Sequence, residues 1–189
     1  MPPDPTVTLT GLPPFLQDSY ATNPVLTTVV MALALGLVAW LAFEVSHRYV
    51  LRWLYHLGQK TTAEWDDALL NRGFFKLLAF AVPLLIVRAG LPYLPALPDA
   101  VVVPLQRTIV ALIVVVGSLA ITAFIKALSD IYEESSYAAT KPIKSYTQAL
   151  QLIVFGLTLI FLFGVLFGRN PLLVLSSVGA ASAILLLVF

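Results

Sequence analysis

The sequence predicts an all-α membrane protein with five transmembrane helices, its N terminus outside and its C terminus inside. Three observations support this fold class. Only 11% of the 189 residues are charged and 59% are hydrophobic, whereas charged residues make up about 25% of a soluble domain. The apolar residues gather in long stretches separated by short polar connections, and Lys and Arg concentrate in alternate connections.

The N-terminal tail, residues 1–24, is rich in proline and contains no Lys or Arg. We expect it to be extended, poorly ordered and extracytoplasmic. It has neither the basic start nor the short apolar core of a signal peptide, so we expect it to be kept.

A single transmembrane domain is predicted to cover residues 25–189. The first span, 25–43, carries no charge and would be about 28 Å long as a helix, close to the ~30 Å of a hydrocarbon core. The predicted spans are residues 25–43, 74–91, 108–125, 147–167 and 172–189.

Details at the ends of the other spans support their assignment. The second contains Lys76 and Arg88, but both lie near its ends, where long side chains can reach the interface. The third lies between Arg107 and Lys126. Ser145-x-x-Gln148 predicts a capping box at the start of the fourth.

The positions of Lys and Arg predict the orientation. The connections after the first and third spans are rich in these residues, whereas the tail and the other two connections are poor in them, so the rich connections should be cytoplasmic. The rich set is Arg48, Arg52, Lys60, Arg72, Lys126, Lys141 and Lys144, and the poor set is Arg88, Arg107 and Arg169.

The composition also argues against several kinds of chemistry. The chain has no cysteine, and its two histidines, His47 and His56, are spaced to lie on different helix faces, so we expect no metal site. Every charge near a span lies at its end, which weighs against a pump, a symporter or an intramembrane protease. We expect no catalytic residue, no cofactor and no nucleic-acid partner.

Two acidic groups lie in the cytoplasmic connections. Asp66 and Asp67 could form a paired-carboxylate site, but they follow the capping box Thr61-x-x-Glu64, and acids at a helix start are favoured by its dipole. We therefore interpret them as a helix N-terminus. The second group, which we interpret as a solvated face, is Asp130, Glu133 and Glu134.

Small residues mark the last span. Ser176 and Ala180 are four residues apart, as are Gly179 and Ala183, and such pairs let helix backbones approach closely in lipid. From this pattern alone, an ordinary packing contact within the bundle or between subunits is the favoured interpretation.

Three segments nevertheless resemble one known family, the MscS-type mechanosensitive ion channels, and within it the five-span YbdG-like branch. Residues 60–75 read KTTAEWDDALLNRGFF, like the Trp-Asp-Asp helix before that branch's second span. Residues 140–155 read TKPIKSYTQALQLIVF, like the entry to its fourth span. Residues 170–189 read NPLLVLSSVGAASAILLLVF, like the start of its pore helix.

The resemblance implies a homo-oligomeric ring, usually of seven subunits, in a bacterial inner membrane, acting in osmotic protection. The last helix of each subunit would line a pore for ions, and the other helices would meet membrane lipids. Gly179, Ala183 and Leu187 form a stripe on one face of that helix. Leu187 matches the position of a bulky apolar constriction, the hydrophobic gate. Ala183 stands where many members have a second leucine. If the alignment is shifted by one position, Leu186 occupies the gate position.

The resemblance also places residues at the membrane surface and leaves one domain unmatched. We expect contacts with cytoplasmic headgroups from Arg48, Arg52 and Arg72, together with Trp53 and Trp65, although the arginines could equally act on topology alone. No part of the sequence corresponds to the family's β-rich cytoplasmic vestibule.

A different class of function also fits the last span. The chain could be a non-channel membrane scaffold or assembly subunit that binds another helix through the face of Gly179 and Ala183.

Overall fold

The structure is a computed structural model that describes residues 23–50, 64–94, 97–133 and 143–189, and no described residue lies in a strand. The described part is helical apart from short turns, as predicted. In chain order its elements are α3 (Pro24–Val45), the π-helical turn η1 (Ser46–Val50), α5 (Glu64–Asn71), α6 (Phe74–Gly90), the 3₁₀ turn η2 (Leu91–Tyr93), α7 (Asp99–Glu133), α8 (Lys144–Leu166) and α9 (Pro171–Val188).

Five helices in the described part are long and apolar enough to cross a membrane, α3, α6, α7, α8 and α9. This confirms the five predicted spans and is the mark of a multi-pass membrane protein. Each span matches one helix, and the helices begin and end close to the predicted limits except in α7 and at the start of α8.

Helix α7 shows the largest difference from prediction, because its 35 residues extend well beyond the predicted stretch 108–125 at both ends. The thickness of the membrane limits the apolar stretch of a helix but not the helix itself. The stretch 108–125 stays the predicted membrane-spanning part of α7, and the helix itself continues beyond Arg107 and Lys126.

The predicted start of α8 is wrong in one respect. The helix begins at Lys144, so Ser145 lies inside the first turn and cannot act as the N-cap. The residue in the N-cap position is Ile143, whose side chain caps nothing. The hydroxyl of Thr147 donates instead to the carbonyl oxygen of Lys144, at 2.8 Å.

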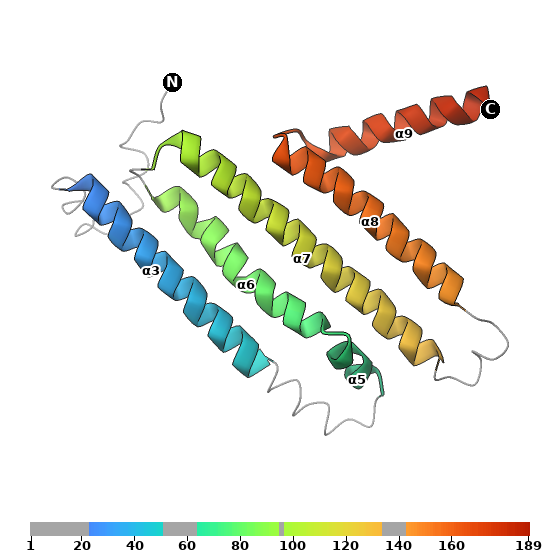
Figure 1. Cartoon of the computed structure of the whole chain (residues 1–189), viewed down its shortest axis with the longest axis horizontal. Helices are drawn as coiled ribbons and strands as arrows, with labels where there is room; N and C mark the ends of the chain where they lie inside the picture. Colours follow the sequence, from blue (N-terminus) through green and yellow to red (C-terminus); the bar gives the residue numbers. More distant parts are fainter. Residues whose placement is uncertain (1–22, 51–63, 95–96, 134–142) are drawn as a thin grey trace.

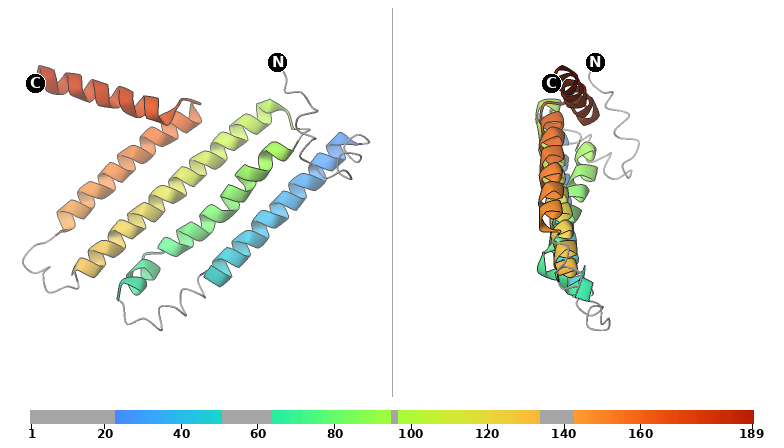
Figure 2. Two further views of the ribbon diagram at one scale, coloured as in Figure 1. Left: turned by 180° about the vertical axis from the view of Figure 1, so that it is seen from behind. Right: turned by 90° about the vertical axis from the view of Figure 1, so that its right-hand side faces the viewer.

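Helices α3, α6, α7 and α8 lie side by side in chain order, each antiparallel to the one before (Figure 1). Seen from the edge, they form roughly one layer (Figure 2). Because no other described helix covers the faces of this layer, large apolar side chains remain exposed along all four helices. Lipid or other subunits must therefore cover these surfaces in a membrane.

The four helices run antiparallel (Figure 1), so the charges at their ends fall at the two ends of the layer. We call the end that holds α5, the last turns of α3 and α7 and the first turn of α8 the charge-rich end (Figure 1). It carries Arg48, Arg72, Lys76, Lys126 and Lys144 among the described basic residues, and the opposite end carries Arg88, Arg107 and Arg169. The alternation on which the orientation was predicted is thus present in the fold.

Different interactions hold the layer together at different levels. At the charge-poor end Leu91, Leu94 and Ile109 form a buried apolar cluster against α3. Midway along, Thr158 Oγ1 of α8 lies 2.6 Å from Ser118 Oγ of α7 and 2.6 Å from the carbonyl oxygen of Val154. Since a hydroxyl has one hydrogen, Thr158 can donate to the carbonyl and accept from Ser118.

Candidate pore helix and headgroup contacts

The turn between α8 and α9 is fixed by local hydrogen bonds. The backbone N–H of Arg169 donates to the carbonyl of Gly164 at 2.8 Å, and that of Gly168 donates to the carbonyl of Val165 at 3.2 Å. Together with the positive φ of 64° at Gly168, these bonds form a Schellman motif, the common way to end a helix.

Two glycines let this turn close tightly. A Cβ at Gly164 would lie 2.8 Å from the Cα of Pro171, so α8 and the start of α9 are in close contact. A Cβ at Gly168 would lie 2.5 Å from a guanidinium nitrogen of Arg107 in α7. The turn therefore packs against α7 as well as linking α8 to α9.

The start of α9 is capped by its own sequence. The side chain of Asn170 accepts a hydrogen bond from the backbone N–H of Leu172 at 3.0 Å, and Pro171 occupies the first turn, where its missing N–H costs nothing. Such a cap stabilises a helix by about 1 kcal/mol.

After this start, α9 leaves the layer (Figures 1 and 2). Among its residues only Pro171, Val174 and Leu175 are half-buried, and all the others are exposed. The predicted pore stripe is uncovered by the described residues: Leu187 is 88% exposed, and no atom beyond the adjoining turns of α9 lies within 4 Å of a Cβ built at Gly179. Ala183 is exposed as well.

The predicted packing residues Ser176 and Ala180 are exposed too. The hydroxyl of Ser176 donates to the carbonyl of Leu173 in its own helix, at 2.9 Å. Within the described chain, these small residues therefore make no contact with a neighbouring helix. Of the two packing contacts that the sequence allowed, the one within the bundle is not formed.

The predicted headgroup residues have different surroundings. Arg48 forms an ion pair with Glu44 one turn earlier in α3, and 69% of its side chain is exposed. Arg52 and Trp53 lie outside the described residues. Trp65 belongs to α5, but its side chain lies outside the described part of the structure.

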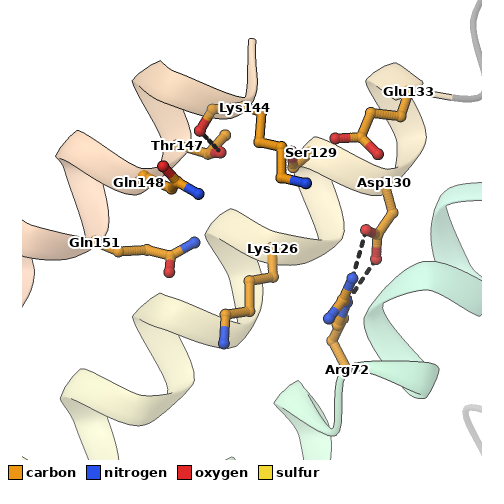
Figure 3. A pocket seen from close by; sticks show the side chains of 9 residues that line it. All are labelled: Arg72, Lys126, Ser129, Asp130, Glu133, Lys144, Thr147, Gln148 and Gln151. Atoms are coloured by element: carbon orange, nitrogen blue, oxygen red, sulfur yellow. Dashed lines mark hydrogen bonds and ion pairs between the residues drawn. The ribbon is translucent and has the colours of Figure 1, made fainter. Parts of the chain in front are cut away.

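Arg72 has a protein partner that the sequence did not predict. It lies in the turn between α5 and α6, and its Nε and Nη2 each donate to a carboxylate oxygen of Asp130, at 2.6 Å (Figure 3). Asp130 belongs to α7, 58 positions along the chain. From sequence we interpreted it as part of a solvated face. Its side chain is still 32% exposed, and the pairing with Arg72 is what that interpretation did not include.

The ion pair changes the acidity of both groups, which lie outside the membrane-spanning stretches. The hydrogen bonds from Arg72 hold the pKa of the Asp130 carboxyl below its usual range, although partial burial opposes the change. The same hydrogen bonds raise the pKa of Arg72. The charged pair is therefore the stable form around neutral pH.

Beside this ion pair lies a cavity of about 280 Å³ between α7 and α8, which we call the polar pocket. Its lining includes Lys126 and Lys144, together with the side-chain amides of Gln148 and Gln151 (Figure 3). In the sequence, Lys126 and Lys144 indicated only the orientation of the spans. Gln148 and Gln151 are three residues apart in α8, and residues at this spacing lie on the same helix face. This spacing is the feature of the local sequence that could have indicated a polar face here.

No protein-family model, curated protein or solved structure matches this chain. The resemblance to the MscS family thus depends on the three sequence segments that show it.

Proposed function

We propose that this chain is a subunit of a tension-gated, weakly selective ion channel of the MscS type, acting in osmotic protection in a bacterial inner membrane. One observation carries the proposal. Helix α9 is apolar, lies apart from the layer and has no buried residue. A helix whose small-residue face is covered by none of the described residues suits a ring of copies, in which each α9 packs on the next.

In such a ring, the stripe of α9 would face the central pore. Leu187, which contacts nothing that would bury it here, would meet its copies at the narrowest point. A narrow ring of leucine side chains excludes water, so ions cannot cross until the ring widens. No residue of α9 is charged, and this favours weak ion selectivity.

The layer of α3, α6, α7 and α8 offers a way for membrane tension to act. A single layer exposes much apolar surface to lipid. If the open state occupies more membrane area, tension favours it in proportion to that extra area. The ion pair of Arg72 with Asp130 joins the start of α6 to α7. Because the turn at Gly168 is held by hydrogen bonds, a movement of α8 would also move α9.

The alternative of a scaffold or assembly subunit uses the same uncovered face of α9. In that case the face of Gly179 and Ala183 would bind a helix of another protein, and no current would flow. Electrical recording separates the two functions.

The test is patch recording under suction, with the chain expressed in cells that lack their own mechanosensitive channels. We expect tension-gated current, and we expect Leu187→Ser to lower the suction needed for opening, because a hydroxyl hydrates the constriction. Leu185→Ser is the matched control, since Leu185 lies two residues away on the opposite side of α9 and is also exposed.

Three results would count against the proposal or its details. Absence of any tension-gated current from the unaltered chain contradicts the channel function. An unchanged threshold for Leu187→Ser moves the gate to another position. An equal fall in threshold for Leu185→Ser would mean that polarity anywhere on α9 matters, and not a ring at Leu187.

A further inference from the structure

The polar pocket at the charge-rich end contains more positive than negative charge. Its cations are Arg72, Lys126 and Lys144, and its acids are Asp130 and Glu133. Arg72 and Asp130 neutralise each other through two hydrogen bonds. The remaining charges of the pocket are two positive lysines and one negative glutamate. Among the described residues neither lysine has an ion-pair partner.

Neutral hydrogen-bonding groups complete the pocket. The amides of Gln148 and Gln151 extend from α8 toward α7, and Lys144 reaches toward Ser129 (Figure 3). Amide N–H, hydroxyl and ammonium groups can all donate to an anion with several oxygens, such as a phosphate. The surroundings of the free lysines thus suit a phosphate group.

A second cavity lies in the same seam between α7 and α8, deeper in the membrane-spanning part. It has a volume of about 300 Å³, and its lining is almost entirely apolar, with Gly117 and Ile121 from α7 and Leu157 and Phe161 from α8. No atom lies within 4 Å of a Cβ built at Gly117, so the absence of a side chain there leaves the cavity open. We call it the apolar groove.

The spacing of the two cavities suits a phospholipid. Gln148 of the polar pocket and Thr158 of the apolar groove are ten residues apart on one helix, which is about 15 Å along the axis. Half of a ~30 Å hydrocarbon core is about 15 Å. A lipid whose phosphate lies in the polar pocket would therefore have an acyl chain at the depth of the groove.

We propose that the seam between α7 and α8 is a specific binding site for one anionic phospholipid. Lys126 and Lys144 hold the phosphate, the glutamine amides donate to its remaining oxygens, and one acyl chain lies in the groove beside Gly117. A net positive pocket favours a lipid with net negative charge over a zwitterionic one. This proposal does not depend on channel function.

The experiment uses the whole chain in neutral detergent, with added dioleoyl phosphatidylglycerol and, separately, dioleoyl phosphatidylcholine. Native mass spectrometry measures the affinity of the first bound lipid. We expect the phosphatidylglycerol to bind at least tenfold more tightly than the phosphatidylcholine. The double variant Lys126→Met/Lys144→Met should weaken phosphatidylglycerol binding at least tenfold and leave phosphatidylcholine binding unchanged.

Two further variants make the test specific. Lys144→Met should weaken phosphatidylglycerol binding, whereas Lys76→Met should not, since Lys76 is an exposed lysine of α6 at the same end but outside the pocket. Gly117→Leu fills the groove and should weaken phosphatidylglycerol binding severalfold with both lysines in place. A thermal unfolding curve for each variant checks that it is folded.

Several results would overturn the proposal. An equal loss of phosphatidylglycerol affinity in Lys76→Met and Lys144→Met would mean that binding depends on the general surface charge and not on the pocket. Unchanged affinity in the double lysine variant would rule out the pocket. Unchanged affinity in folded Gly117→Leu would rule out the groove. Binding of inorganic phosphate that Lys126→Met/Lys144→Met removes, with no preference for phosphatidylglycerol over phosphatidylcholine, would mean that the pocket binds free phosphate and not a lipid.

Discussion

Helices α7 and α9 both carry a stripe of small residues, but only the stripe of α7 is covered. Ala120, Ala123 and Ala127 of α7 are buried, and Ala127 is 0% exposed. The corresponding small residues of α9, Gly179 and Ala183, are covered by no other described helix. Similar patterns thus have different surroundings: the stripe of α7 is covered by helices of the same chain, whereas the described residues provide no cover for the stripe of α9.

The largest effect that would sharpen this comparison is expected in α7. Ala127→Leu adds three carbons at a position with no exposed surface. We expect it to lower the free energy of unfolding by about 1–3 kcal/mol, because overpacking forces neighbouring side chains and backbone to shift. Unfolding by sodium dodecyl sulfate in mixed micelles measures this change.

The control for that substitution is Ala149→Leu, which adds the same atoms at an exposed position of α8. It should leave the free energy of unfolding within about 0.5 kcal/mol of the unaltered chain. Equal effects of the two substitutions would contradict the difference between covered and uncovered small residues.

A second substitution tests the uncovered small-residue stripe of α9. Gly179→Leu should not destabilise the single chain, because nothing surrounds this position and leucine favours a helix more than glycine does. It should instead weaken self-association at least tenfold, about 1.4 kcal/mol, by keeping helix backbones apart. Dilution experiments with two fluorescent labels measure the association.

Ala181→Leu serves as the matched control for α9, since Ala181 is two residues from Gly179 and lies on the opposite face. We expect it to leave association unchanged. Loss of association in Ala181→Leu but not in Gly179→Leu would place the contact on the other face and remove the predicted stripe from the interface.

The smallest expected effect concerns the hydrogen bond between Ser118 of α7 and Thr158 of α8. A double-mutant cycle with Ser118→Ala and Thr158→Val should give a coupling energy of about 0.6 kcal/mol, as is typical of hydrogen bonds between helices in membranes. Pairing Thr158→Val with Thr108→Val should give none, because the Thr108 hydroxyl donates to the Pro104 carbonyl of its own helix. A coupling of zero for Ser118 would show that small-residue packing alone holds the seam.

Much of the fold was predictable from local patterns. The five apolar helices follow from stretches long enough to cross a membrane, and the sorting of charges to two ends follows from alternation along the chain. Predictions failed where a helix continued past the basic residues that bound its apolar stretch, as in α7, and where a hydroxyl in the right spacing did not cap, as at Ser145. Neither outcome depends on hydropathy.

The candidate sites were predictable to a smaller extent. The stripe of Gly179, Ala183 and Leu187 could be located from spacing within one helix. The pairing of Arg72 with Asp130 could not, because it joins two segments 58 positions apart. For the same reason the polar pocket was missed: Lys126 and Lys144 come from two different helices, and each was visible in the sequence only as a charge at the end of a span.

By itself, the sequence determined the features that arise from near neighbours: the apolar helices, the cap at Asn170 and the turn at Gly168. Their hydrogen bonds and backbone angles involve residues within a few positions of each other. Only the tertiary structure decided the order of helices in the layer, the contents of the polar pocket and which small-residue stripe is covered. These depend on which distant segments pack together, because burial and ion pairing need a partner that the local sequence does not specify.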